Sequence, residues 1–279
     1  HIFGESEVKG ISKMVLYFVT PCVIVESFQR DMNETLVKNL LITVAVAFAS
    51  YGVAILMASL LIHDKEESRQ VVLRFAAIFG NCGFMSLPIE EALLGPDGVF
   101  YGAVFIAAFN VIVWTYGLAI MTGDYRKISW KKLLFNPGII GTLIGILVFV
   151  CHIKLPFILA QPVSFIADLN TPLPMMIIGY YLGNLRPRQL VENKRQYLSI
   201  LIKLILAPAV TLLMMWPFHL DKTVIEVCVI ASAAPAAANT AMFAGLYGRD
   251  PQLGAQLVSV GTLFSLITIP TMVAIGSFL

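Results

Sequence analysis

The stretch of sequence that decides the fold reads FGNCGFMSLP and runs from Phe79 to Pro88. It lies inside a long apolar segment, residues 70–94, yet its glycines, asparagine, serine and proline are poor choices for the middle of a membrane helix. Lipid offers no water to a freed backbone amide, so a broken helix persists only where protein or a polar cavity covers it. We therefore expect a helix break here that the rest of the chain surrounds.

A second stretch of this kind, AAPAAANTA, runs from Ala233 to Ala241, and each stretch contains one proline and one asparagine. A single interruption of a membrane helix by glycine or proline is usually a packing kink. Two interruptions at matching places in an internal repeat instead point to a binding site at the bilayer midplane. We therefore predict that the two broken helices meet near the midplane and form a transport site.

The composition indicates an all-α polytopic membrane protein. The chain is 58% hydrophobic and 13% charged, with a mean hydropathy of +0.83, whereas soluble domains carry about 25% charged residues. The net charge of +2 gives no reason to expect a nucleic-acid partner, and the four cysteines show no metal or disulfide spacing. We therefore predict no metal and no cofactor. Nine apolar segments are expected to be helices: 8–28, 36–62, 70–94, 99–121, 137–153, 163–183, 197–218, 224–246 and 253–279.

An internal repeat relates the two halves of the chain. Gly102 and Gly254 stand in similar surroundings 152 positions apart, and Thr20-Pro21 and Thr171-Pro172 stand 151 positions apart. The first four apolar segments therefore map onto the last four, and 137–153 has no counterpart. We expect one integral membrane domain with a first repeat over 1–123, lacking its first helix, and a second over 124–279. The complete protein would have ten helices in two inverted five-helix repeats.

The basic residues predict the orientation. When the loops are assigned alternately to the two sides, 14 lysines and arginines fall on one side and 4 on the other. The side rich in positive charge is expected to be cytoplasmic. The basic loops 63–74, 124–132 and 186–196 would then face the cytoplasm, and the chain would lie in the cell membrane as a multi-pass protein.

Each helix break exposes N–H groups at one half-helix start, which favour an anion, and C=O groups at one half-helix end, which suit a cation. No carboxylate pair lies at the breaks, which favours an organic anion. The predicted substrate-binding residues are Asn81, Cys82, Gly83, Ser86, Pro88, Pro235, Asn239 and Thr240. A second set, which lines the site from the scaffold side or only kinks its helices, is Thr20, Pro21, Thr171 and Pro172.

Among the charged residues of the apolar segments, three bear on the predicted site. We expect Glu90 and Glu91 to be interfacial, with the lining of an outer vestibule as the alternative. Lys203 is expected to snorkel towards the cytoplasmic side, with a counter-charge for an anionic substrate as the alternative.

Three stretches of the chain carry a resemblance to a known family. Residues 7–21 resemble the start of the second helix of the auxin efflux carrier (AEC) family. Residues 80–88 resemble its fourth-helix signature, and residues 235–239 resemble its ninth helix. The short loop between the repeats is similar to that of microbial permeases rather than plant PIN-type auxin carriers. The Asn-Pro-Asn motif of the plant carriers is absent, so auxin itself is not the expected substrate.

The resemblance implies a fold akin to bile-acid sodium symporters and an elevator mechanism. The scaffold, which also forms a homodimer surface, would comprise residues 8–28 and 137–183. The mobile transport domain would comprise residues 36–121 and 197–279. Substrates of the family are mostly organic anions, including auxin and small carboxylates.

We therefore predict a secondary active transporter of a small organic anion, specifically a carboxylate, embedded in the lipid bilayer. Proton or sodium coupling and the direction of transport stay open. The alternatives are a sodium- or proton-coupled symporter or antiporter of related fold, or a membrane protein that does not transport. An enzyme is not expected, because no convergent His, Asp or Glu residues occur at membrane depth.

Overall fold

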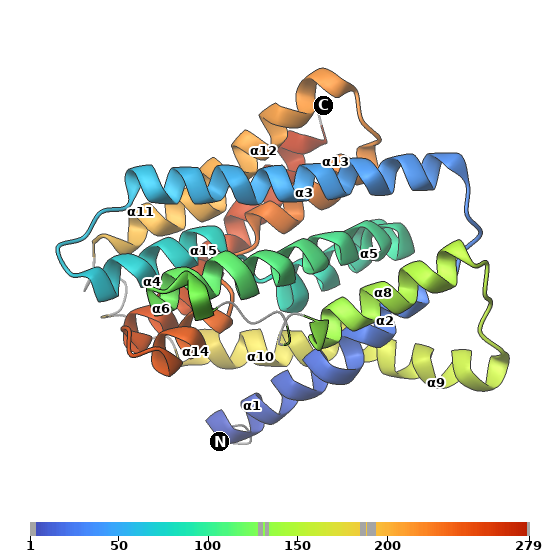
Figure 1. Ribbon diagram of the computed structural model, residues 1–279, viewed down its shortest axis with the longest axis horizontal. Helices are drawn as coiled ribbons and strands as arrows, with labels where there is room; N and C mark the ends of the chain where they lie inside the picture. The colour runs from blue at the N-terminus through green and yellow to red at the C-terminus, as the bar shows by residue number, and fades with distance from the viewer. Residues whose placement is uncertain (1–3, 128–130, 132–133, 185–187, 189–193, 278–279) are drawn as a thin grey trace.

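The computed structural model describes residues 4–127, 131, 134–184, 188 and 194–277. This part of the chain is helical, and its only extended pairing is an isolated antiparallel bridge between Gly80 and Ala236. The expected all-α architecture is confirmed, and every predicted apolar segment contains helix (Figure 1).

The helices of the first half follow the predicted order. The first passage comprises α1 (Glu5–Met14), a π-helical turn (Val15–Val19) and α2 (Thr20–Ser27); α3 (Glu34–Leu61) follows. The first broken passage comprises α4 (Glu67–Ile78), a π-helical turn (Cys82–Ser86) and the start of α5 (Leu87–Ile112). A π-helical turn (Val113–Gly117) and α6 (Leu118–Thr122) complete the next passage.

The second half begins with α8 (Pro137–Val150), α9 (Phe157–Ala167), a 3₁₀ turn (Asp168–Asn170) and α10 (Pro172–Gly183). Then come α11 (Gln196–Leu201), a π-helical turn (Ile202–Leu206) and α12 (Ala207–Met215). The second broken passage comprises α13 (Lys222–Ala233) and α14 (Asn239–Leu246), and α15 (Pro251–Gly276) follows. The segment predicted at 163–183 therefore begins earlier, at Phe157, because Pro162 lies inside α9 instead of before it.

A sharp reversal divides α5 into two helices. Gly95 has φ +62°, a left-handed conformation that favours glycine, and Pro96 follows it. The helices on either side pack closely, because a Cβ at Gly98 would lie 2.4 Å from the carbonyl oxygen of Glu90. This reversal brings the helix after Gly95 back against the broken passage that precedes it.

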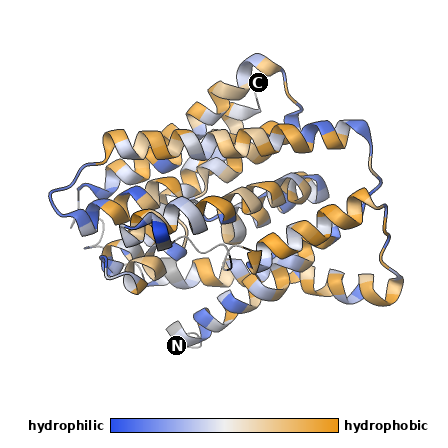
Figure 2. Cartoon of the chain, in the orientation of Figure 1, coloured by the Kyte–Doolittle hydropathy of each residue, from blue (hydrophilic) through white to orange (hydrophobic). Residues whose placement is uncertain are grey.

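The lengths and surfaces of the helices suit a membrane. In the described residues, five helical stretches are long and apolar enough to cross one: Ser6–Ser27, Glu34–Leu61, Cys82–Thr122, Gln196–Phe218 and Pro251–Gly276. The stretch Cys82–Thr122 includes the reversal at Gly95. The other predicted passages fall short because breaks divide them or because, like α8, they are shorter. Figure 2 shows hydrophobic residues along the helices and hydrophilic ones gathered towards their ends. The chain is a multi-pass membrane protein.

Ion pairs bring the loops of one end together. Asp64, after α3, pairs with Arg195, before α11, at 2.5 Å. Arg249, between α14 and α15, pairs with Glu67 at 3.1 Å and donates to the Met121 carbonyl at 2.9 Å. Parts of the predicted basic loops thus meet at the same end of the helices, as the alternation of loops requires.

A second set of contacts joins loops at the opposite end. Arg30, after α2, pairs with Asp97 at 2.5 Å, and its guanidinium lies 4.7 Å from the centre of the Phe100 ring. Lys154 pairs with Asp31 at 2.9 Å. These contacts tie the α2–α3 connection to the turn within α5 and to the α8–α9 connection.

The helices form two groups, and each group contains helices from both halves of the chain (Figure 1). Figure 1 shows α1, α2, α8, α9 and α10 along the lower part of the view, and α3, α12 and α13 along the upper part. Within the lower group, α2 packs on α8 and α9, and α1 packs on α10. The central helix α5 touches both groups, through α2 and α8 on one side and α3 and α13 on the other.

Candidate functional site

The two predicted breaks cross each other. After α4 ends at Ile78 and α13 ends at Ala233, both chains run extended and antiparallel. The Asn81 N–H donates to the Pro235 carbonyl at 2.7 Å, and the Ala237 N–H donates to the Phe79 carbonyl at 2.9 Å. Each break thus satisfies backbone groups that the other has freed, which is how a broken helix persists inside a membrane.

The crossing is symmetric between the two repeats. Phe79 corresponds to Pro235 and Asn81 corresponds to Ala237, and each pair is 156 positions apart. Replacing each residue by its counterpart turns one hydrogen bond of the crossing into the other. Each break contains one asparagine, but Asn239 lies two residues beyond Ala237, the counterpart of Asn81. The offset of 156 positions at the crossing is four larger than the 152 positions that separate Gly102 from Gly254.

The two asparagines differ in their surroundings. The Asn81 side chain accepts a hydrogen bond from the Phe84 N–H at 3.3 Å and so caps the second half of its broken helix. Asn239 is the first residue of α14, and its side chain makes no hydrogen bond within the described part of the chain. Both side chains are half-buried, and so is Gly83, where an added Cβ would meet nothing within 4 Å.

The other predicted binding residues at the breaks are buried: Cys82, Ser86, Pro88, Pro235 and Thr240. Cys82 Sγ lies 3.4 Å from the Tyr51 hydroxyl of α3, and Ser86 Oγ donates to Glu90 Oε1 at 2.5 Å. The Thr240 hydroxyl oxygen has no hydrogen-bond partner in the described residues. The polar groups of Cys82 and Ser86 are therefore used by neighbouring side chains, whereas the buried hydroxyl of Thr240 is not.

Glu90 is not interfacial, and that prediction is wrong. Its side chain is 1% exposed and lies against Gly102, where a Cβ would fall 1.8 Å from Glu90 Oε2. The carboxyl group tolerates this position because Ser86 donates to it and because the reversal at Gly95 brings a glycine opposite it. The carboxyl lies against a glycine that is 12 residues further along the chain.

Glu91 connects the first broken passage to the Thr-Pro motif of the second repeat. Its Oε2 accepts hydrogen bonds from Asn170 Nδ2 at 2.9 Å and Thr171 Oγ1 at 3.2 Å. Thr171 and the following Pro172 are exposed. On the other Thr-Pro motif, the Thr20 hydroxyl is buried without a partner in the described residues, whereas Pro21 packs on Gly141 of α8. Within the described residues, no hydrogen bond joins these four residues to the crossing, although α10 packs against the Cys82–Ser86 turn.

Lys203 does not snorkel, and that prediction is also wrong. Its side chain is 5% exposed, and its ammonium donates to the Ser232 carbonyl at 2.9 Å, next to the end of α13. A Cβ at Gly80 would lie 2.8 Å from Lys203 Nζ. The internal repeat could have indicated this burial. Lys203 lies 152 positions after Tyr51, which is also buried and whose hydroxyl reaches the first break.

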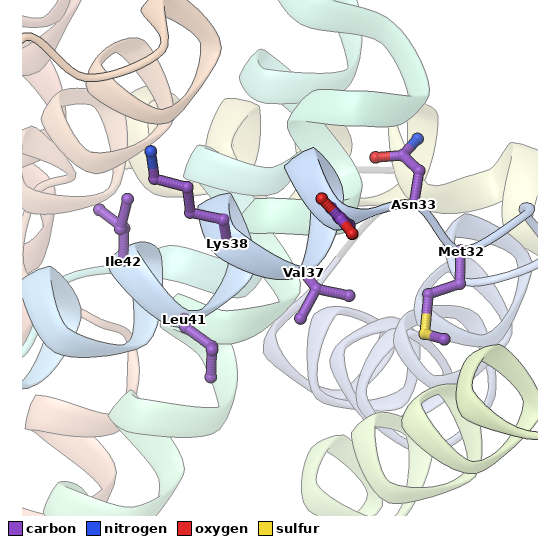
Figure 3. A pocket seen from close by; sticks show the side chains of 7 residues that line it. Met32, Asn33, Val37, Lys38, Leu41 and Ile42 are labelled. Carbon is purple, nitrogen blue, oxygen red and sulfur yellow. The ribbon is translucent and has the colours of Figure 1, made fainter.

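A hollow of about 620 Å³ lies away from the crossing and is lined by one continuous stretch at the start of α3 (Figure 3): Met32, Asn33, Glu34, Val37, Lys38, Leu41 and Ile42. Its side chains come from one stretch alone and do not converge from several elements as those of a ligand site do. At the crossing, two cavities of about 10 Å³ lie beside Lys203. The described residues contain no group of His, Cys, Asp or Glu that could hold a metal ion.

Comparison with known proteins gives the family. The profile of a family described as "Membrane transport protein" matches residues 1–129 and 121–273. An uncharacterized transporter of Methanocaldococcus jannaschii is 25% identical over 96% of this chain and 90% of its own length. Auxin efflux carrier component 8 of Arabidopsis thaliana is 26% identical over 52% of this chain, which covers 40% of that protein. Auxin efflux carrier component 5 of the same plant is 21% identical over 98% of this chain and 89% of its own length.

Proposed function

We propose, from the premise that this chain belongs to the membrane transport protein family, that it is a secondary transporter of a small organic anion, specifically a carboxylate. Transport itself follows from the family, whose relatives here are transporters and not enzymes. The substrate class is the proposal, and the observation that carries it is the antiparallel crossing of two half-helix pairs.

The crossing supports an anion because it collects two helix starts. The half-helix that continues into α5 begins at Asn81, and α14 begins at Asn239, so two positive helix ends lie beside the crossing. The half-buried side chains of Asn81 and Asn239 add amide donors next to these ends. A carboxylate between them would accept from both helices in a site that lipid does not reach.

The two helix groups support an elevator movement. In this proposal α1, α2, α8, α9 and α10 form the scaffold, and the helices that carry the crossing move against it. Phe157 and Ile158 on α9 are 77% and 80% exposed, which offers an apolar scaffold surface to lipid or to a second copy of the chain. Glu91, Thr171 and the Arg30–Asp97 pair bridge the two groups and would have to separate during the movement.

Orientation belongs to the same proposal. The end that carries Arg195 and Arg249 would face the cytoplasm, because it holds the basic loops that the positive-inside rule assigns there. Coupling to a proton or sodium gradient is the part of the proposal that only transport measurements address.

The test is uptake by the full chain in proteoliposomes. Malate, malonate and indole-acetate are compared under imposed proton and sodium gradients, with protein-free vesicles as the background. Asn81→Ala should abolish uptake, whereas the matched variant Asn184→Ala, which removes an exposed asparagine at the end of α10, should transport normally. Cation uptake without any dependence on an organic anion would sink the proposal.

A further inference from the structure

Lys203 occupies an unusual position for a charged residue. It lies on the π-helical turn between α11 and α12, and its ammonium reaches the broken passage of α13. Ser232, which accepts its hydrogen bond, is the penultimate residue of α13, so its carbonyl belongs to the negative end of that half-helix. The ammonium therefore lies at a helix-end carbonyl, the type of group that the breaks were expected to offer to a cation.

The ammonium stands behind the crossing, on the face opposite Asn81. Gly80 and Ala236 are directly opposed across the antiparallel pair, so their Cβ positions point to one face. That face is the Lys203 face, because a Cβ at Gly80 would meet Lys203 and because Ala236 lines a cavity with it. Side chains alternate along an extended segment, so Asn81 and Ala237 point to the other face. One layer of backbone separates the ammonium from the proposed substrate face.

The charge of Lys203 is not balanced by another side chain. An ammonium has three donors, and one is used by Ser232; no carboxylate pairs with Lys203 in the described part of the chain. Glu90, the buried acidic residue of the described part of the chain, accepts a hydrogen bond from Ser86. An unpaired charge at membrane depth is costly, so we expect a negatively charged group to balance it.

We propose that Lys203 is a tethered cation of the transport site. Its ammonium fills the place among the helix-end carbonyls that a bound metal cation would otherwise take. The carboxylate that binds on the Asn81 face balances this positive charge from the other side of the crossing backbone. This inference rests on the proposed function for the carboxylate. It adds that the anion binds without an inorganic cation, because the chain supplies one.

The test replaces the charge in two ways and tries to restore it. Lys203→Ala leaves space at the carbonyls, whereas Lys203→Met keeps the volume without the charge. Lys222→Met, at an exposed lysine that starts α13, is the matched control. Each full-length protein is placed in lipid nanodiscs, and its melting temperature is measured in choline chloride, sodium chloride and methylammonium chloride. Malonate uptake is then measured in proteoliposomes with the same salts.

Lys203→Ala should melt at a lower temperature, and methylammonium should raise that temperature more than choline does. Lys203→Met should not respond, because its side chain blocks the space, and the wild type and the control should not respond either. Malonate uptake should fall at least tenfold in both Lys203 variants and recover in the alanine variant with methylammonium or sodium.

Two results would overturn the inference. The first is a Lys203→Met protein that takes up malonate at the wild-type rate. The second is a methylammonium response that is equal in the wild type and in Lys203→Ala. If the wild type takes up none of the anions, the proposed substrate class has failed, but the melting temperatures still decide whether Lys203 acts as a cation at the carbonyls. If Lys203→Ala folds only with methylammonium present, that result supports the inference.

Discussion

Gly80→Ala is the smallest substitution that probes the crossing. The new Cβ would lie 2.8 Å from both Cε and Nζ of Lys203 and 3.0 Å from the Ala234 carbonyl oxygen. Ordinary contact needs 3.4 Å or more, so the ammonium must move by about 0.6 Å and its 2.9 Å hydrogen bond to Ser232 is weakened or lost. A hydrogen bond to a charged group contributes about 1.5–3 kcal/mol, and overpacking costs about 1–3 kcal/mol. Together these contributions predict a total loss of about 2.5–6 kcal/mol.

Thermal melting of the full chain in nanodiscs measures this loss. At about 2 °C per kcal/mol for a protein of this size, the loss corresponds to a decrease of roughly 5–12 °C in melting temperature. Gly52→Ala is the matched control, because its Cβ would meet nothing within 4 Å and alanine favours the middle of α3 by about 0.5–1 kcal/mol. In a Lys203→Ala background the cost of Gly80→Ala should fall to about 1 kcal/mol, because the two closest atoms are gone and only the 3.0 Å approach to the Ala234 carbonyl oxygen remains. An equal cost in both backgrounds would refute the assigned contact.

Three further predictions concern groups near the site and at the end of the helices. Gly102→Ala should destabilise more than Gly80→Ala, because its Cβ would fall 1.8 Å from Glu90 Oε2, and a second change, Glu90→Ala, should recover part of the melting temperature. The Glu66 N–H bonds to Asp64 and holds the pKa of that carboxyl below its usual value, so Asp64→Asn should lower stability at neutral pH. The stability difference between the wild type and Asp64→Asn should vanish as the pH falls through the lowered pKa, since residue 64 is then uncharged in both proteins. A stability difference that persists at low pH contradicts the assignment. Thr240→Val removes a buried hydroxyl without a partner in the described residues, so the melting temperature should hold or rise while malonate uptake falls if that hydroxyl serves the substrate; unchanged uptake removes it from the site.

The sequence allowed the breaks to be predicted, because their signals are local. Glycine and proline at Gly80 and Pro235 oppose helix wherever the chain folds, and Gly95 before Pro96 marks a reversal in the same way. Pro162 is the exception, because α9 accommodates it in its interior, and the predicted start of that passage was therefore late.

The surroundings of the charged residues could not be predicted by the same reasoning. The depths of Glu90 and Lys203 were judged from their distance along the chain to a segment end. Their actual environment comes from residues distant in sequence, Gly102 for one and Ser232 for the other. The register of the crossing lies beyond sequence reasoning for the same reason, because it is set by backbone pairing between Asn81 and Pro235, which are 154 positions apart.

Asn239 offers a more direct test of the central claim than Asn81. Asn81 caps a half-helix, so its loss affects both the fold and any ligand, whereas the Asn239 side chain makes no hydrogen bond within the described residues. The measurement is equilibrium binding of radiolabelled malonate to the purified full chain, wild type against Asn239→Ala, with the melting temperature recorded for both. If the crossing is the anion site, Asn239→Ala should lose at least tenfold in affinity at an unchanged melting temperature. Equal affinity in the two proteins would contradict that claim.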